Sequence, residues 1–434
     1  MESTTSEPSS PEGGQHAPIP EQPAREKNIA AIVEYIASGI KPLGETGKLG
    51  IELEHTVVDE QLGPVSYREP EGVAWLLEQL SEHYPEKTID DEGNLIGVAR
   101  PGETLTLEPA AQLELSAGPY EEIGQIRVDF ELFQRNLAKL LAPVRKRTLT
   151  VGYHPTARSA DLHLIPKRRY AAMDAHFATI GDYGRHMMRA SASTQVSIDY
   201  YSVEDCLRKL RLGFVLAPLF ALICDNAPTF EGRPRPHELV RTKIWLACDP
   251  ARCGVIPGAL DPGFTLESYA AFALDSPAVF VPGDDPSCER TERTFGEIYA
   301  ERAMTRAEVE HALSLVFTDV RLKTYLELRP ADALPVPFVT AYAALVKGLF
   351  YSEESLSELD SLFAHVTESD IGQAKAELME KGYRAHVYGR EAGRLVDALL
   401  SLARKGLASN EANYLSPLVH LASTRTTLAS MAQR

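Results

Sequence analysis

The sequence lacks the motifs that mark several common enzyme classes. It contains no glycine-rich dinucleotide fingerprint, no GxSxG nucleophile motif and no HExxH motif, which argues against dehydrogenase and hydrolase functions. Gly44–Lys48 (GETGK) has part of a phosphate-loop pattern, but the GxxxxGK[ST] spacing is absent and neither Ser nor Thr follows Lys48. We interpret this segment as a turn that leads into a strand.

Cysteines are few and do not form paired motifs. The chain has 5 cysteines, an odd number that is typical of a reducing cytoplasm and not of a disulfide framework. Cys248 and Cys253 are close in sequence, but no second pair accompanies them, so a zinc site is not indicated. We expect a cytoplasmic protein with buried or inactive thiols at Cys206, Cys224, Cys248, Cys253 and Cys288.

Long apolar stretches are also missing. The strongest apolar run, Leu212–Cys224, is too short to span a bilayer and predicts a buried helix. Residues 1–25 are rich in Ser, Pro, Glu and Gly and lack the apolar core of a signal peptide, which predicts a disordered tail.

Basic residues are outnumbered by acidic ones, 44 to 61, so the net charge is -17. Such a surface repels phosphate backbones and anionic membranes, so neither nucleic acid nor a membrane is an expected partner. An acidic protein that handles a nucleotide needs local positive charge from metal ions or from well-placed arginines.

The rest of the chain has an ordinary globular composition, 44% hydrophobic and 24% charged. We expect one domain over residues 26–434, with a sheet-rich core over 45–335 and a mainly helical part over 336–434. The spacing of apolar residues predicts helices at 27–40, 72–83, 126–141 and 203–225, and a strand at 148–153. Thr305 and Glu308 have the spacing of a capping box that opens a helix.

Four further segments alternate apolar and polar residues with a period of two. In Gly50–Val57, Glu52 and Glu54 share one face of the predicted strand while the neighbouring Ile and Leu residues take the other. Thr104–Ser116, Gln195–Asp199 and Arg321–Arg329 repeat this pattern. Each segment alone is typical of an amphipathic strand with a solvated outer face.

Taken together, the four segments favour a functional interpretation. Glutamate is depleted in strands, and two like charges on one face repel each other. If the polar faces converge, a hard divalent cation such as magnesium would relieve the repulsion, and magnesium also binds substrate phosphates. The sequence therefore predicts a nucleotide triphosphate site around the carboxylates of Glu52, Glu54, Glu108, Glu114 and Glu327.

At these positions the sequence resembles the glutamate–cysteine ligases of the plant and proteobacterial group and their actinobacterial relatives. The matching segments occur in family order and cover roughly residues 45–335. They are GIELEHTVVD, LTLEPAAQLELSAGP, MMRASASTQVSIDY, RTKIWLACDPARCG and VRLKTYLELRPAD, which begin at residues 50, 105, 187, 241 and 320, with GYHP and PKRRYAAM as further family-like segments.

The resemblance implies an α+β fold of the glutamine synthetase type, in which a curved, mainly antiparallel sheet forms a funnel with helices outside. It implies one catalytic domain and metal ligands at Glu52, Glu54, Glu108, Glu114, Gln195 and Glu327. It also implies catalytic roles for Arg329 and Glu327, substrate binding by Arg241, Trp245, Gln112 and Glu114, and cofactor binding by Glu108 and Arg189. For Arg189, a salt bridge is an equally open interpretation.

The activity implied by the resemblance is the ATP-dependent joining of the glutamate γ-carboxylate to the amine of cysteine through an acyl phosphate. ATP and Mg²⁺ would be the cofactors and the partners would be small-molecule substrates, in glutathione or ergothioneine biosynthesis, with the oligomeric state left open. Ala110 and Ala111 replace two family glycines and Ser197 replaces a family asparagine, which affects the substrate assignment more than the reaction class.

Two alternatives stay open from the sequence. One is a related enzyme that uses another amine or stops at phosphoryl transfer. The other is a non-catalytic sensor on the same fold, against which the retained carboxylates argue, since a scaffold needs no metal ligands.

Overall fold

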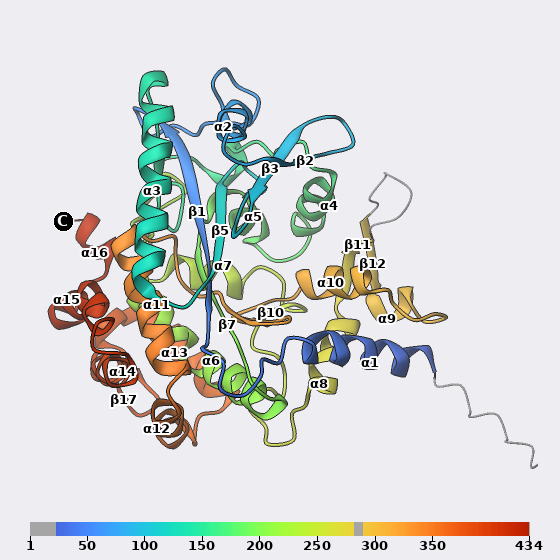
Figure 1. The fold of residues 1–434 in the computed structure, drawn as a ribbon, viewed down its shortest axis with the longest axis vertical. Coiled ribbons are helices and arrows are strands. Elements are labelled where there is room, and N and C mark those ends of the chain that lie inside the picture. Colours follow the sequence, from blue (N-terminus) through green and yellow to red (C-terminus); the bar gives the residue numbers. More distant parts are fainter. Residues whose placement is uncertain (1–22, 282–289, 434) are drawn as a thin grey trace, which may run out of the picture.

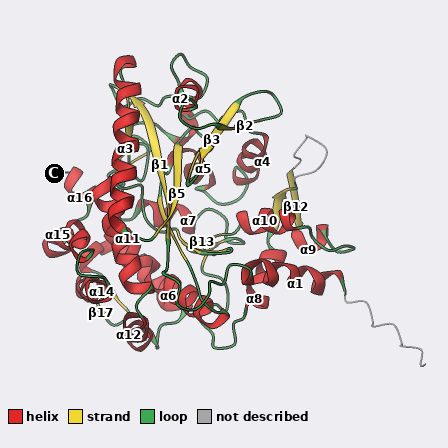
Figure 2. Ribbon diagram, viewed as in Figure 1, coloured by secondary structure: helices red, strands yellow, loops and turns green. Residues whose placement is uncertain are grey.

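The computed structural model describes residues 23–281 and 290–433 (Figure 1). Most of the predicted tail and Cys288 lie outside the described residues. Figure 2 shows strands near the centre of the molecule with helices around them. No helix within the two described ranges is long and apolar enough to cross a membrane.

A nine-stranded sheet forms the centre of the fold, and all of its strand pairs are antiparallel. Its strand order is β14-β15-β7-β1-β5-β4-β3-β2, and β6 pairs with the far end of β1. The strands are β1 (Leu49–Asp59), β2 (Glu86–Ile89), β3 (Leu95–Arg100), β4 (Glu103–Leu107), β5 (Leu113–Tyr120), β6 (Lys146–Leu149), β7 (Thr194–Ile198), β14 (Val320–Leu322) and β15 (Leu326–Leu328).

Four two-stranded ribbons lie outside this sheet, and only the β10–β13 pair is parallel among the strand pairs of the described residues. The ribbons are formed by β8 (Thr229–Phe230) with β9 (Arg233–Pro234), β10 (Cys253–Gly254) with β13 (Phe317–Thr318), β11 (Pro277–Phe280) with β12 (Arg290–Thr294), and β16 (His386–Val387) with β17 (Arg390–Glu391).

Helices surround the sheet, and those of the last hundred residues pack against one another beside it (Figure 1). The helices are α1 (Ala24–Ala37), α2 (Val73–Leu80), α3 (Ile123–Leu141), α4 (Arg168–Phe177), α5 (Gly184–Ala190), α6 (Val203–Ile223), α7 (Val240–Leu246), α8 (Leu266–Asp275), α9 (Phe295–Ile298), α10 (Arg306–Ser314), α11 (Val336–Phe350), α12 (Glu353–Phe363), α13 (Glu368–Lys381), α14 (Ala392–Gly406), α15 (Ser416–Thr424) and α16 (Leu428–Ala432).

Two of the predicted helices begin with a side-chain cap. The Ser202 hydroxyl accepts a hydrogen bond from the Asp205 amide at the start of α6, which stabilises a helix that is buried over most of its length. Thr305 and Glu308 form the predicted capping box of α10. The α+β class and the mainly antiparallel sheet with outer helices are confirmed.

Two segments predicted as single strands are each two strands joined by a turn. The first divides into β4 and β5, because Pro109 lacks an amide hydrogen and Ala111 adopts a positive φ of 68°. The second is the β14–β15 hairpin, closed by a hydrogen bond of 2.9 Å from the Lys323 amide to the Tyr325 carbonyl. In both cases the antiparallel partner returns the polar residues to the same face of the sheet.

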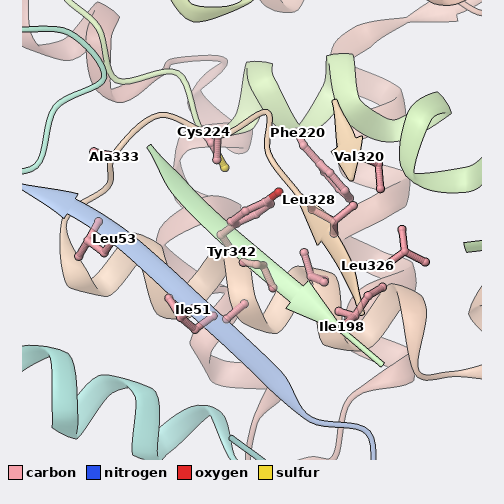
Figure 3. Packing of buried hydrophobic residues seen from close by; sticks show 14 of the residues in the cluster. Ile51, Leu53, Ile198, Phe220, Cys224, Val320, Leu326, Leu328, Ala333 and Tyr342 are labelled. Carbon is pink, nitrogen blue, oxygen red and sulfur yellow. The ribbon is translucent and has the colours of Figure 1, made fainter. Parts of the chain in front are cut away.

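The apolar face of the sheet packs against α6 and α11. Ile51 and Leu53 of β1 are buried on the side of the sheet that α11 covers (Figure 3), and they alternate along the strand with the glutamates, which take the other face. Burying each such side chain stabilises the fold by roughly 1.5–3 kcal/mol. Because a shift by one residue would move these side chains to the other face, their burial fixes the register of the strands. Figure 3 places Ile198, Leu326, Leu328, Phe220, Cys224 and Tyr342 in the same layer.

Candidate active site

The register of the sheet brings the predicted carboxylates together on one face. Glu54 of β1 lies opposite Glu114 of β5, and Glu52 lies opposite Gln195 of β7. Residues that face each other across an antiparallel pair share one side of the sheet. The four side chains therefore form one polar patch, on the face opposite the apolar layer.

This patch is the floor of a cavity of about 270 Å³, which we call the carboxylate cavity. Its walls come from α4, α5 and α7 and from the segment between α10 and β13. The side chains that line it include Glu52, Glu54, Glu108, Glu114, Gln112, Gln195, Ser193, Arg169, Tyr170, Met173, Met187, Met188, Arg241, Trp245, Phe317, Arg321, Lys323 and Arg329.

Burial and mutual repulsion raise the pKa values of three glutamates in the cavity. Burial, and then the charge of Glu108, raises the pKa of Glu54 well above its ordinary value, and burial with the charge of Glu327 does the same for Glu52. Burial and three neighbouring glutamates raise the pKa of Glu114 further. Such shifts are expected where carboxylates gather without a cation.

Hydrogen bonds fix two of these carboxylates in place. The Ser193 hydroxyl and amide donate to the two oxygens of Glu54 at 2.6 and 3.0 Å. The Thr106 hydroxyl donates to one oxygen of Glu114 at 3.0 Å. The donors orient the carboxylates without neutralising them.

Glu327 differs from the other glutamates because two arginines neutralise it. Arg321 donates to both of its oxygens at 2.6 and 3.0 Å, and Arg329 donates to one of them at 3.0 Å. Burial raises the pKa of Glu327, but Arg321, Lys323 and Arg329 outweigh burial and hold the pKa far below its ordinary value.

These contacts alter the role expected of Glu327. Its side chain is fully buried and is not among those that line the cavity, because both of its oxygens face guanidinium groups. The predicted metal contact at Glu327 would require one of these bonds to be exchanged. In the arrangement observed here, Glu327 positions Arg321 and Arg329.

Arg241 and Trp245, the pair predicted to bind substrate, both line the cavity. The Arg241 guanidinium carbon lies 5.4 Å from the Trp245 ring centroid, and that of Arg329 lies 5.7 Å from the same ring. Arg241 is only 5% exposed, and its Nε donates to the Arg329 carbonyl at 3.3 Å. Two guanidinium groups beside an aromatic plane suit the carboxylate of a small substrate.

The two glutamines have different surroundings. The Gln195 oxygen accepts a hydrogen bond of 2.5 Å from Arg329, so it helps to orient that arginine. Gln112 uses its amide group entirely on backbone: its oxygen accepts from Ala110, and its nitrogen donates to the Arg189 and Ser191 carbonyls. Gln112 thus fixes the β4–β5 turn against α5, although it also lines the cavity.

Arg189 does not have the predicted contact with the cavity. Its guanidinium donates to Asp174 at 2.8 Å and to the Leu162 carbonyl at 3.0 Å, and it is not among the lining residues. Of the two interpretations left open, the salt bridge is the one found. The ion pair joins α5 to α4.

Several lining residues were not identified from the sequence. Arg321 and Lys323 belong to the alternating pattern of the last strand segment, but they received no role. Arg169 also lines the cavity, although the sequence predicts no role for it. Met187 and Met188 are further lining residues that the sequence does not single out. The family-like segment PKRRYAAM was the signal that could have identified Arg169.

The donor set fits a hard divalent cation. Among residues 23–281 and 290–433, no three His, Cys, Asp or Glu side chains are arranged closely enough to hold a metal ion as they stand. However, Glu52, Glu54 and Glu114 present buried oxygens whose pKa values are raised first by burial and then by neighbouring glutamates. Oxygen donors of this kind are the ligands that magnesium prefers.

The residues that line the cavity all lie within the part of the chain that matches known proteins. A family profile described as "Glutamate-cysteine ligase family 2(GCS2)" matches residues 48–431. The chain is 29% identical over 384 residues to glutamate–cysteine ligase B, chloroplastic, of Oryza sativa subsp. japonica, which covers 87% of this chain and 77% of the relative. It is 28% identical over 408 residues to the chloroplastic glutamate–cysteine ligase of Medicago truncatula, covering 92% and 80%.

A solved structure also has a similar fold. The crystal structure of a glutamate–cysteine ligase from Francisella tularensis in complex with AMP matches with a TM-score of 0.55 and 12% identity, covering 89% of this chain and 84% of that chain. The similarity shows a common arrangement of sheet and helices.

Proposed function

The chain belongs to glutamate–cysteine ligase family 2, and from this premise we propose that it uses ATP to join the γ-carboxylate of glutamate to the amine of cysteine. The products are γ-glutamylcysteine, ADP and phosphate. The single observation that carries the proposal is the carboxylate cavity, in which four strands place glutamates and arginines on one face of the sheet.

Activation of the carboxylate is the first step. A carboxylate does not react with an amine at neutral pH, so the glutamate γ-carboxylate first attacks the γ-phosphorus of ATP, and ADP leaves. Arg329 is held by Glu327 and Gln195 and lines the cavity, so it presents fixed positive charge where the acyl phosphate forms. Because these partners are already in place, little reorganisation is needed during the step.

Arg241 and Trp245 are suited to hold the amino-acid end of glutamate. Arg241 is buried and anchored by its Nε, which leaves its terminal nitrogens for a carboxylate ligand. A charge-assisted contact at this end would keep the γ-carboxylate directed towards the glutamates of the floor and the nucleotide phosphates.

Glu52, Glu54, Glu108 and Glu114 are the residues that would hold magnesium, with Gln195 as a neutral neighbour. When bound, magnesium supplies positive charge to the phosphate oxygens of ATP. The chain's own part is to hold these carboxylates in a fixed arrangement, which the hydrogen bonds from Ser193 and Thr106 support.

In the second step the deprotonated amine of cysteine attacks the acyl carbon, the C–N bond forms and phosphate leaves. No covalent bond to the protein is required, which agrees with the four described cysteines being free thiols. The product belongs to glutathione biosynthesis. A role in ergothioneine biosynthesis is a narrower proposal.

The test is to incubate the protein with ATP, magnesium and glutamate, with and without cysteine, and to measure ADP and the dipeptide by mass. We expect γ-glutamylcysteine and ADP in equal amounts only when cysteine is present. Replacing cysteine with 2-aminobutyrate, which lacks the thiol, tests whether another amine serves as well. ADP release without any dipeptide would contradict the proposal and favour a phosphoryl-transfer enzyme.

A further inference from the structure

Two cations lie on the ring of one buried tyrosine at the α4 wall of the carboxylate cavity. The Lys167 Nζ is 4.8 Å and the Arg169 Cζ is 5.0 Å from the Tyr170 ring centroid. Tyr170 is only 2% exposed, and both Tyr170 and Arg169 line the cavity. Cation–π contacts of this kind limit the positions that the two long side chains can adopt.

The segment that carries these cations is attached to the floor of the cavity. The Tyr170 hydroxyl donates to the Leu107 carbonyl at 3.0 Å, and the Ile165 amide donates to the Pro109 carbonyl at 2.9 Å. Leu107 and Pro109 flank Glu108, one of the proposed magnesium ligands. These two hydrogen bonds therefore fix the position of the segment that carries the cations relative to Glu108.

The other arginines of the cavity already have partners. Arg321 and Arg329 bind Glu327, and Arg241 is tied to a backbone carbonyl and to Trp245. Within the part of the chain that the structure describes, Arg169 has an aromatic contact but no carboxylate partner. Its guanidinium is therefore available to a ligand.

The electrostatics of the segment favour an anion beside it. Burial, and then the charge of Arg169, lowers the pKa of Lys167 to about 8, while Glu108 and Glu114 raise it. The two cations thus repel each other while lying within electrostatic reach of the floor. An anion that contacts these two cations would reduce their mutual repulsion. The same anion could also contact metal ions bound to the glutamates of the floor.

We propose that Arg169, with Lys167 beside it, binds the polyphosphate of ATP at the α4 wall of the carboxylate cavity. This inference rests on the proposed ATP-dependent function. A polyphosphate fits better than an amino-acid carboxylate because it can bridge dications on the floor and a guanidinium fork on the wall. The carboxylate of glutamate already has a more buried partner in Arg241.

The experiment compares Arg169→Ala and Arg169→Lys with wild type, and uses Arg168→Ala as the matched control. Arg168 is the adjacent cation, but its guanidinium lies 3.9 Å from Glu92 and it does not line the cavity. Binding of ATP, ADP and AMP with magnesium is measured by calorimetry in the absence of amino acids. Km values for ATP and glutamate are then measured by ADP release.

We expect Arg169→Ala to weaken ATP binding by at least about tenfold and AMP binding by less than about twofold, because AMP lacks the β- and γ-phosphates. In Arg169→Ala the Km for glutamate should stay within about twofold of wild type. In Arg168→Ala the nucleotide affinities and both Km values should stay within the same limit. The ATP affinity of Arg169→Lys should lie between those of wild type and Arg169→Ala, since lysine keeps the positive charge but lacks the planar guanidinium group that can bind two phosphate oxygens. An unchanged melting temperature shows that each variant is folded.

The inference is overturned if Arg169→Ala binds ATP as tightly as wild type, loses ATP and AMP equally, or raises the Km for glutamate instead. Failure of the proposed function is distinguishable. Wild-type protein that binds ATP but forms no dipeptide contradicts the ligase activity and leaves the binding result for Arg169 standing. Wild-type protein that binds no ATP overturns both.

Discussion

Glu54 and Glu114 lie directly opposite each other on β1 and β5, with their carboxylates on the same buried face of the sheet. Like charges in this position destabilise an antiparallel pair. The hydrogen bonds from Ser193 and Thr106 hold the two groups in place without supplying a positive charge. The fold therefore keeps an unfavourable contact at the point where the proposed metal would bind.

Glu114→Gln should make the metal-free protein more stable and less active. The Gln oxygen can still accept from Thr106, while the new amide removes the cost of burying an ionisable carboxyl group opposite Glu54. We expect the free energy of unfolding in urea to rise by about 1 kcal/mol. We also expect dipeptide formation to fall by about 100-fold or more. The control is Glu86→Gln on the exposed strand β2, which should change neither quantity. Equal activity in Glu114→Gln and wild type would exclude Glu114 from the site.

Magnesium should stabilise the protein more strongly as the pH rises. Burial and neighbouring charges raise the pKa of Glu52 and Glu54 to about 7 in the folded state, from an ordinary value of 4.5. Their contribution to stability is therefore fully present below pH 4.5 and is lost as the pH rises through about 7. The metal-free protein should lose stability across this window.

The measurement is the melting temperature with and without magnesium between about pH 5 and pH 8. Because magnesium binds the deprotonated carboxylates, the difference between the two curves should widen with pH. A difference that stays constant over the window would contradict the assignment of these glutamates to the metal.

Glu327→Gln should destabilise the fold strongly. The substitution leaves the Arg321 guanidinium buried against an amide, and a buried charge that loses its partner costs roughly 3–5 kcal/mol. Urea unfolding measures this loss, and activity should fall with it because Arg329 loses its orienting contact. Asp275→Asn is the control, since it removes an exposed partner of Arg25 and should cost less than about 1 kcal/mol. Similar losses in the two variants would argue against a buried network at Glu327.

Ala111→Gly and Ala110→Gly should have opposite effects on stability. Ala111 has a φ of 68°, which costs an L-residue roughly 1–2 kcal/mol, while Ala110 is not among the residues with positive φ. Glycine relieves the strain at Ala111, and part of this gain is offset by the greater freedom of glycine in the unfolded chain. We expect Ala111→Gly to be neutral or to stabilise by up to about 1 kcal/mol, and Ala110→Gly to destabilise by about 0.5–1 kcal/mol. Thermal unfolding measures both, and equal losses would contradict the strain at Ala111.

The alternation of apolar and polar residues predicted the shared face of the glutamates, but it did not predict every strand of the sheet. It placed Glu52 and Glu54 correctly on one face, but it missed β2, whose four residues are all exposed and so show no alternation. It also missed the β14–β15 turn, because Lys323, Thr324 and Tyr325 include no glycine, proline or asparagine that would signal a turn.

The cations were harder to predict than the carboxylates. Arg189 and Arg169 are both arginines beside family-like motifs, and no local pattern distinguishes them. The difference arises because Asp174 lies within reach of Arg189, whereas Arg169 lies against the ring of Tyr170.

The sequence by itself determined which glutamates share a face, because a strand repeats every two residues whatever surrounds it. Only the tertiary structure decided which charges stay available for ligands. An ion pair such as Arg321 with Glu327 depends on which strands lie side by side, and the availability of Arg169 depends on carboxylates that come from distant segments of the chain.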